Sequence, residues 1–152
     1  MAAMFIHFSL RLLAGLSVGL LAAGAGMFLA WFIYLFVVPR STAALLSLLI
    51  VGAGIGAGIG AVVAWLHLRH NRRRTTLATA IMTTIAGSLG SYGGYGFLIS
   101  SGELFVETDR LAVIGRPDLN PTVIFLIGAT VAANVAMLGV AISSKFRRHG
   151  PR

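Results

Sequence analysis

The sequence predicts an all-α integral membrane protein whose four transmembrane helices form an up-down bundle of two hairpins. Of its 152 residues, 57% are hydrophobic and only 11% are charged, whereas soluble domains carry roughly a quarter of charged residues. The apolar residues gather in four long runs, and Lys and Arg gather at the ends of these runs. We therefore expect one domain, residues 1–152, that lies in a lipid bilayer.

Each apolar run is long enough to cross about 30 Å of hydrocarbon, which takes about 20 helical residues. The predicted spans cover about residues 12–38, 42–66, 77–99 and 122–143. Asn120 followed by Pro121 predicts the start of the fourth helix, with an N-cap side chain and then proline at the first helical position. A cleavable signal peptide is the competing interpretation of the N-terminus. The first run continues far beyond a 7–15-residue signal core, which favours an uncleaved span.

The distribution of Lys and Arg predicts that both termini and the loop near residues 67–75 lie in the cytoplasm. Nine of the 12 cations would lie on that side, namely Arg11, Arg69, Arg72, Arg73, Arg74, Lys145, Arg147, Arg148 and Arg152. Among these we expect lipid-headgroup contacts for Arg69, Arg72, Arg73, Arg74, Lys145, Arg147 and Arg148. This pattern indicates a multi-pass protein of the bacterial cytoplasmic (inner) membrane, with the bilayer rather than nucleic acid as its charged partner.

The single external loop, residues 100–120, holds all four acidic residues of the chain. Within it, apolar and charged residues alternate. This alternation suits a short element on the outer membrane face, or one that docks onto a partner subunit.

The stretch VGAGIGAGIGAVVAW at 51–65 predicts a helix built for close contact. A strand exposed to lipid would leave its backbone groups unpaired. On a helix, steps of four residues place small side chains along two opposite faces. These faces hold Gly52, Gly56 and Gly60 on one side, and Gly54 and Gly58 on the other. We therefore expect this helix to pack between two neighbours.

The other spans carry small residues at matching intervals, and we expect helix packing there as well. The glycines concerned are Gly15, Gly19, Gly90, Gly94 and Gly128. Two interpretations stay open. Either all these faces pack the protein's own four helices, or one face remains for a copy of the chain or for another membrane subunit.

The same glycine-rich stretch resembles the first helix of the rotor-ring subunit of rotary ATP synthases. That resemblance implies an ion-carrying carboxylate midway along the following helix and a chain of two spans. Here the following span, LATAIMTTIAGSLGSYGGYGFLI, has no carboxylate, and the chain has four predicted spans. We therefore interpret the likeness as convergent packing chemistry.

No Asp, Glu, Lys or Arg lies inside any predicted span, although proton relays and ion-coupled carriers display buried ionisable groups. Cysteine is absent, which excludes thiolate metal sites within the chain. His67 and His70 have the spacing of a metal pair, but headgroup contact is the simpler interpretation. We expect no enzyme activity, no metal and no cofactor.

Polar side chains in the last two spans form a candidate polar path. Its members are Thr76, Thr79, Thr83, Ser91, Thr130 and Asn134. They would line a narrow route for a small solute, or else bond to helix backbone and cross-link the helices.

Taken together, these patterns predict a structural or accessory subunit that packs through glycine-rich faces against other transmembrane subunits or copies of itself. The alternative is a homo-oligomeric channel or facilitator for a small neutral or weakly charged solute, lined by the last two helices.

Overall fold

The computed structural model describes residues 2–37, 42–67, 76–101, 105–107, 110–112 and 120–146, and the side chains of residues 9–36, 44–65, 77–101 and 120–143. Its elements are α1 (Ala2–Val37), α2 (Thr42–His67), α3 (Thr76–Ser100), β1 (Phe105–Glu107), β2 (Arg110–Ala112) and α4 (Pro121–Phe146). The four predicted helices are therefore present, in an all-helical fold of the membrane class.

Three of the helices are long and apolar enough to cross a membrane: Ser9–Phe36 in α1, Ala44–Trp65 in α2 and Pro121–Ser143 in α4. The 25 residues of α3 make it long enough as well. Its threonine, serine and glycine residues lower its hydropathy, and it is not among the three.

α1 is longer than the predicted span, because it begins at Ala2 rather than near residue 12. The prediction followed the apolar run that comes after Arg11. Residues 2–10 contain no glycine or proline that would stop a helix, so the helix continues toward the N-terminus. At 36 residues, it measures about 54 Å.

The start of α4 confirms the predicted cap. The Asn120 Oδ1 accepts a hydrogen bond from the Thr122 backbone N–H at 3.0 Å, and the Asn120 carbonyl accepts from Val123 at 3.0 Å. Pro121 occupies the first helical position, where its missing N–H costs nothing. The helix therefore starts where the sequence places it.

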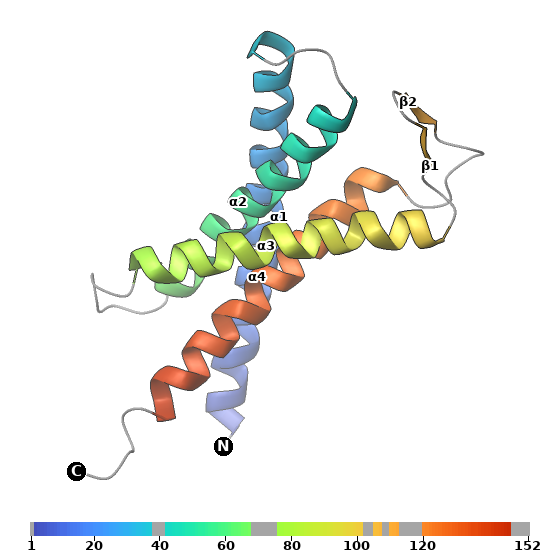
Figure 1. Ribbon diagram of the computed structural model, residues 1–152. Coiled ribbons are helices and arrows are strands. Elements are labelled where there is room, and N and C mark those ends of the chain that lie inside the picture. Colours follow the sequence, from blue (N-terminus) through green and yellow to red (C-terminus); the bar gives the residue numbers. More distant parts are fainter. Residues whose placement is uncertain are drawn as a thin grey trace.

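Between α3 and α4, β1 and β2 form an antiparallel pair that joins Phe105 to Ala112 and Glu107 to Arg110. Figure 1 shows this pair within the connection from α3 to α4. The alternation of apolar and charged residues thus falls on a short strand pair.

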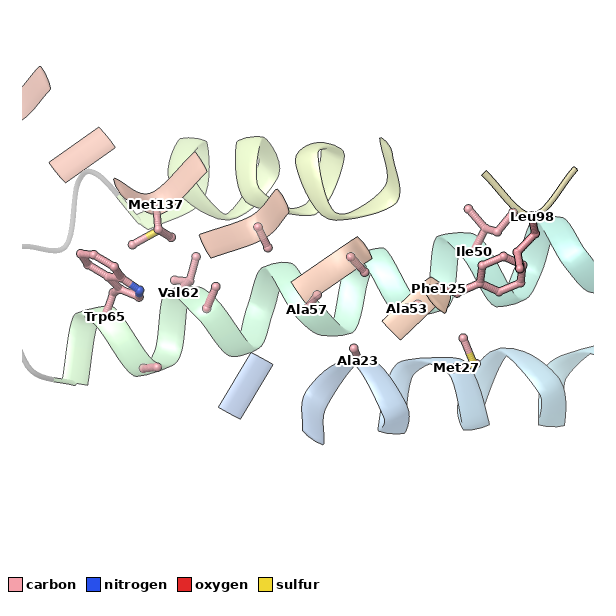
Figure 2. Close-up of a cluster of buried hydrophobic side chains, with 14 residues drawn as sticks. Ala23, Met27, Ile50, Ala53, Ala57, Val62, Trp65, Leu98, Phe125 and Met137 are labelled. Atoms are coloured by element: carbon pink, nitrogen blue, oxygen red, sulfur yellow. The ribbon is translucent and has the colours of Figure 1, made fainter. Parts of the chain in front are cut away.

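Both α2 and α4 pack against all three of the other helices, and α2 does so most extensively. In Figure 1, α3 runs across the direction of α1, and the helices approach one another near their middles. The core is thin there. Figure 2 shows Ala23, Ala53 and Ala57 along its middle, with larger side chains toward the two ends. Small residues at the crossing let the helix backbones come close.

Large apolar side chains cover the outside of the molecule. On α2 they form a single ridge, consisting of Val51, Ile55, Ile59 and Val63, which are 42–53% exposed. The bulky side of this helix faces outward and the slim sides face the neighbouring helices. In a soluble protein such a surface would aggregate, whereas lipid accepts it.

Candidate functional site

The side of α2 that carries Gly52, Gly56 and Gly60 lies against α1. A methyl group placed on Gly52 would come within 2.6 Å of the Ala30 Cβ, and one placed on Gly60 within 2.8 Å of the Ala22 Cβ. A methyl group on Gly56 would overlap the Ala22 carbonyl oxygen. The two backbones are therefore in direct contact, and no larger residue fits without moving a helix.

The opposite side of α2 lies against α3. A methyl group on Gly58 would lie 2.6 Å from the Thr84 Cα, and one on Gly54 would overlap Ser88. From the α3 side, a methyl group on Gly87 would lie 2.7 Å from the Gly54 carbonyl oxygen. Both slim faces of α2 are thus occupied by helices of the same chain.

The glycines of α3 and α4 form a third close contact. Gly90 and Gly128 face each other so closely that a methyl group on either one would overlap the carbonyl oxygen of the other. One turn further along α3, a methyl group on Gly94 would lie 3.0 Å from the Ile124 Cγ2. These two helices therefore approach each other through backbone as well.

Two glycines of α1 make room for side chains of α2 and α4. A methyl group on Gly15 would lie 2.7 Å from the Trp65 Nε1 and would overlap the Asn134 Oδ1. A methyl group on Gly19 would lie 3.2 Å from the Thr130 Cγ2. The absence of side chains at these positions opens the space that Asn134 fills.

Asn134 joins three helices through its carboxamide group. The side chain is 2% exposed. Its Oδ1 accepts the Trp65 Nε1–H of α2 at 3.1 Å. Its Nδ2 donates to the Gly15 carbonyl of α1 at 3.2 Å and to the Thr130 carbonyl of α4 at 2.9 Å. Both amide protons are used, so a side chain that is costly to bury becomes an interhelical link.

Thr83 connects α3 to α2 and is completely buried. Its hydroxyl lies 3.3 Å from the Gly58 carbonyl oxygen of α2, and 2.9 Å from the Thr79 carbonyl oxygen of its own helix. A hydroxyl has one proton to donate, so the carbonyls of its own helix and of the neighbour compete for it. The missing side chain at Gly58 is what brings its carbonyl within reach.

The remaining members of the candidate polar path are spread over several contacts. Ser91 and Thr130 are buried, and their hydroxyls have no hydrogen-bond partner within the described part of the chain. Thr79 is buried as well, whereas the side chain of Thr76 lies outside the described residues. Thr83 therefore faces α2, while Asn134 faces α1 and α2, and the two do not share one interface between α3 and α4.

The predicted headgroup contacts lie outside the described residues, because Arg69, Arg72, Arg73, Arg74, Arg147, Arg148 and the side chain of Lys145 are not described. In the ranges that are described, no three His, Cys, Asp or Glu side chains gather as metal ligands would.

Sequence reasoning missed the role of Trp65, a residue for which it proposed no contact within the fold. The indole is instead buried and bonded to Asn134. Its partner lies 69 positions away in the chain, so no local pattern marks the pair. The nearest signal is the i, i+4 spacing of Thr130 and Asn134, which repeats the spacing of Gly15 and Gly19.

Four further glycines behave differently from those that sequence reasoning selected. A methyl group on any of them would meet no atom within 4 Å: Gly24, Gly93, Gly96 and Gly139. These open glycines lie on the outer surface of α1, α3 and α4, where no described residue covers them.

Comparison with known proteins gives no relative, since no family model, no curated protein and no solved structure matches the chain.

Proposed function

We propose that this chain is a structural or accessory subunit of a larger membrane complex, in which it packs against other transmembrane subunits. In this proposal all four helices cross the membrane as two hairpins, with both termini in the cytoplasm. The excess of Lys and Arg at the predicted cytoplasmic ends supports the orientation and suits a bacterial cytoplasmic membrane.

Contacts between consecutive helices support the hairpin arrangement. Along the contact between α1 and α2, residue numbers rise on one helix as they fall on the other, from Gly52 beside Ala30 to Gly60 beside Ala22. The contact between α3 and α4 follows the same rule, with Gly90 beside Gly128 and Gly94 beside Ile124. Each pair therefore runs antiparallel at its contact.

The observation that carries the proposal is the use made of buried polar groups. Asn134 and Thr83 direct their side chains to backbone carbonyls of neighbouring helices. Such groups hold helices together in lipid, where apolar side chains give no hydrophobic drive for association. Two of the positions that sequence reasoning offered for a solute thus make hydrogen bonds between helices, which supports a structural role for them.

The closely packed glycines are committed to contacts inside the chain, so a partner subunit would have to use other positions. The open glycines supply them, and α3 carries two of the four, Gly93 and Gly96. They lie beside Tyr92, which is 61% exposed, and Phe97, which is 53% exposed. Glycine lowers helix stability by up to about 1 kcal/mol relative to alanine, and close approach of a partner helix would offset that cost.

Native mass spectrometry of the protein, extracted from its own membrane in mild detergent, tests the proposal. We expect a defined complex with other membrane subunits or with further copies. The double substitution Gly93→Leu and Gly96→Leu should release the partner, whereas Gly139→Leu, at an open glycine of α4, should retain it. A wild-type chain that is always a partnerless monomer would count decisively against the proposal.

The second candidate function is a homo-oligomeric channel or facilitator for a small neutral or weakly charged solute. The buried hydroxyls of Ser91 and Thr130, which have no hydrogen-bond partner in the described ranges, favour it. Solute flux into liposomes should then fall for Asn134→Leu or Thr83→Leu. Unchanged flux in both variants would remove Asn134 and Thr83 from the solute pathway.

A further inference from the structure

α3 differs from the other helices in how well lipid would accept it. Among the described helices, α1, α2 and α4 are apolar enough to cross a membrane by composition, and α3 is long enough but is not among them. If α3 crosses the membrane, as the proposed topology requires, contacts with the other helices must supply the stabilisation that its own low hydropathy does not.

Several of the residues that lower the hydropathy of α3 meet α2. Thr83 lies beside the Gly58 carbonyl, while Thr84 and Ser88 lie against Gly58 and Gly54. The outward side of α3 has Ile81, Ile85 and Leu89, which are at least half exposed. α3 therefore has an apolar side for lipid and a polar, small-residue side that fits the slim face of α2.

We propose that α3 crosses the membrane only as the partner of α2, and that the face of α2 formed by Gly54 and Gly58 is what admits it. This inference rests on the proposed topology. Helices α1 and α2 insert by their own hydropathy, and α3 then enters against the face of α2 that α1 leaves open.

The physical reason lies in what surrounds the polar side of α3. Lipid chains offer no hydrogen-bonding groups, and they pack poorly into the shallow surface that glycine and serine leave. α2 offers backbone contact along this surface, and a carbonyl acceptor for Thr83. In membranes, dispersion contacts of small-residue faces and interhelical hydrogen bonds are the interactions that drive helix association.

The chain has no cysteine, so single introduced cysteines report the position of each end of α3 in the full-length protein. Ser101→Cys marks the external end and Leu77→Cys the cytoplasmic end, and both side chains are exposed. In cells whose outer membrane and cell wall have been removed, a membrane-impermeant maleimide should label Ser101→Cys. Leu77→Cys should react only after permeabilisation.

The test pairs two substitutions on α2 that lie two residues apart on opposite faces. Gly58→Leu places a side chain against Thr84 of α3, and Gly56→Leu places one against Ala22 of α1. Both make α2 more apolar. We expect Gly58→Leu to remove most of the external labelling of Ser101→Cys, and Gly56→Leu to retain it, because α1 and α2 each insert unaided.

A rescue separates lost insertion from general misfolding. In the Gly58→Leu chain, Thr79→Val and Thr83→Val together raise the hydropathy of α3, so that it no longer needs α2. External labelling of Ser101→Cys should then return.

Three results would overturn the inference: wild-type labelling in the Gly58→Leu chain, equal loss of labelling in the Gly56→Leu chain, or no recovery in the rescue. If Ser101→Cys in the otherwise wild-type chain is labelled only from the cytoplasmic side, both the inference and the proposed topology are contradicted. Native mass spectrometry still decides the accessory role separately.

Discussion

The indole N–H of Trp65 in α2 donates a hydrogen bond of 3.1 Å to the Oδ1 of Asn134 in α4. The same carboxamide holds the Gly15 carbonyl of α1, so one side chain fixes the relative positions of three helices.

Replacing Asn134 by leucine should destabilise the fold by about 1–2 kcal/mol. The interhelical hydrogen bonds are lost, and the buried indole N–H of Trp65 loses its acceptor on Asn134. Unfolding in mixed micelles of mild detergent and SDS measures this change. Val135→Leu, at the adjacent exposed position, is the matched control and should leave stability unaltered. Equal stability of all three chains would show that the link carries no net energy.

Trp65→Phe should cost less than Asn134→Leu, since it leaves the Asn134 amide bonded to the carbonyls of Gly15 and Thr130. A double-mutant cycle between the two positions isolates their coupling. We expect about 0.6 kcal/mol and at most about 1.7 kcal/mol, the range of interhelical hydrogen bonds in membranes. A coupling of zero would mean that the two side chains act independently.

Two glycine substitutions should have opposite signs. Gly56→Ala forces a methyl group onto the Ala22 carbonyl and should destabilise by about 1–3 kcal/mol, the usual cost of overpacking. Gly24→Ala meets no atom within 4 Å and should stabilise by up to about 1 kcal/mol through helix propensity. The same detergent unfolding measurement compares them, and a shared sign would contradict the packing described for α2.

Asn120→Ala removes the cap of α4 and should cost about 1 kcal/mol. Hydrogen–deuterium exchange should quicken at the amides of Thr122 and Val123, which lose their acceptor or its fixed geometry. Thr122→Ala keeps the acceptor and is the control. Unchanged exchange in the first turn would mean that Pro121 alone defines the helix start.

Much of the helical framework is readable from sequence because apolar run length and capping residues act locally. Asn120 and Pro121 predict the start of α4 correctly, since the hydrogen bond involved spans two residues. The predicted first span did not give the start of α1, because hydropathy reports where lipid lies and not where a helix begins. For α3, the length of the apolar run predicted a membrane span, whereas its hydropathy leaves it outside the three helices that are apolar enough to cross a membrane.

The contacts of the candidate site are harder to predict because they join distant positions. The opposing glycines of α2 indicate two neighbours, but sequence does not say that α1 takes Gly56 and α3 takes Gly58. Nor does it say that Trp65 turns inward to Asn134. These choices depend on how helices cross, which is decided by many small packing energies at once.

The slimness of α2 limits which substitutions this chain can accept during evolution. Nearly every side of the helix touches a backbone, so accepted changes should concentrate on its outward ridge, where Val51, Ile55, Ile59 and Val63 are free to exchange for other apolar residues. A deep mutational library of this segment would then show tolerant positions at every fourth residue, and the positions between them from Gly52 to Ala61 would admit almost nothing larger than alanine.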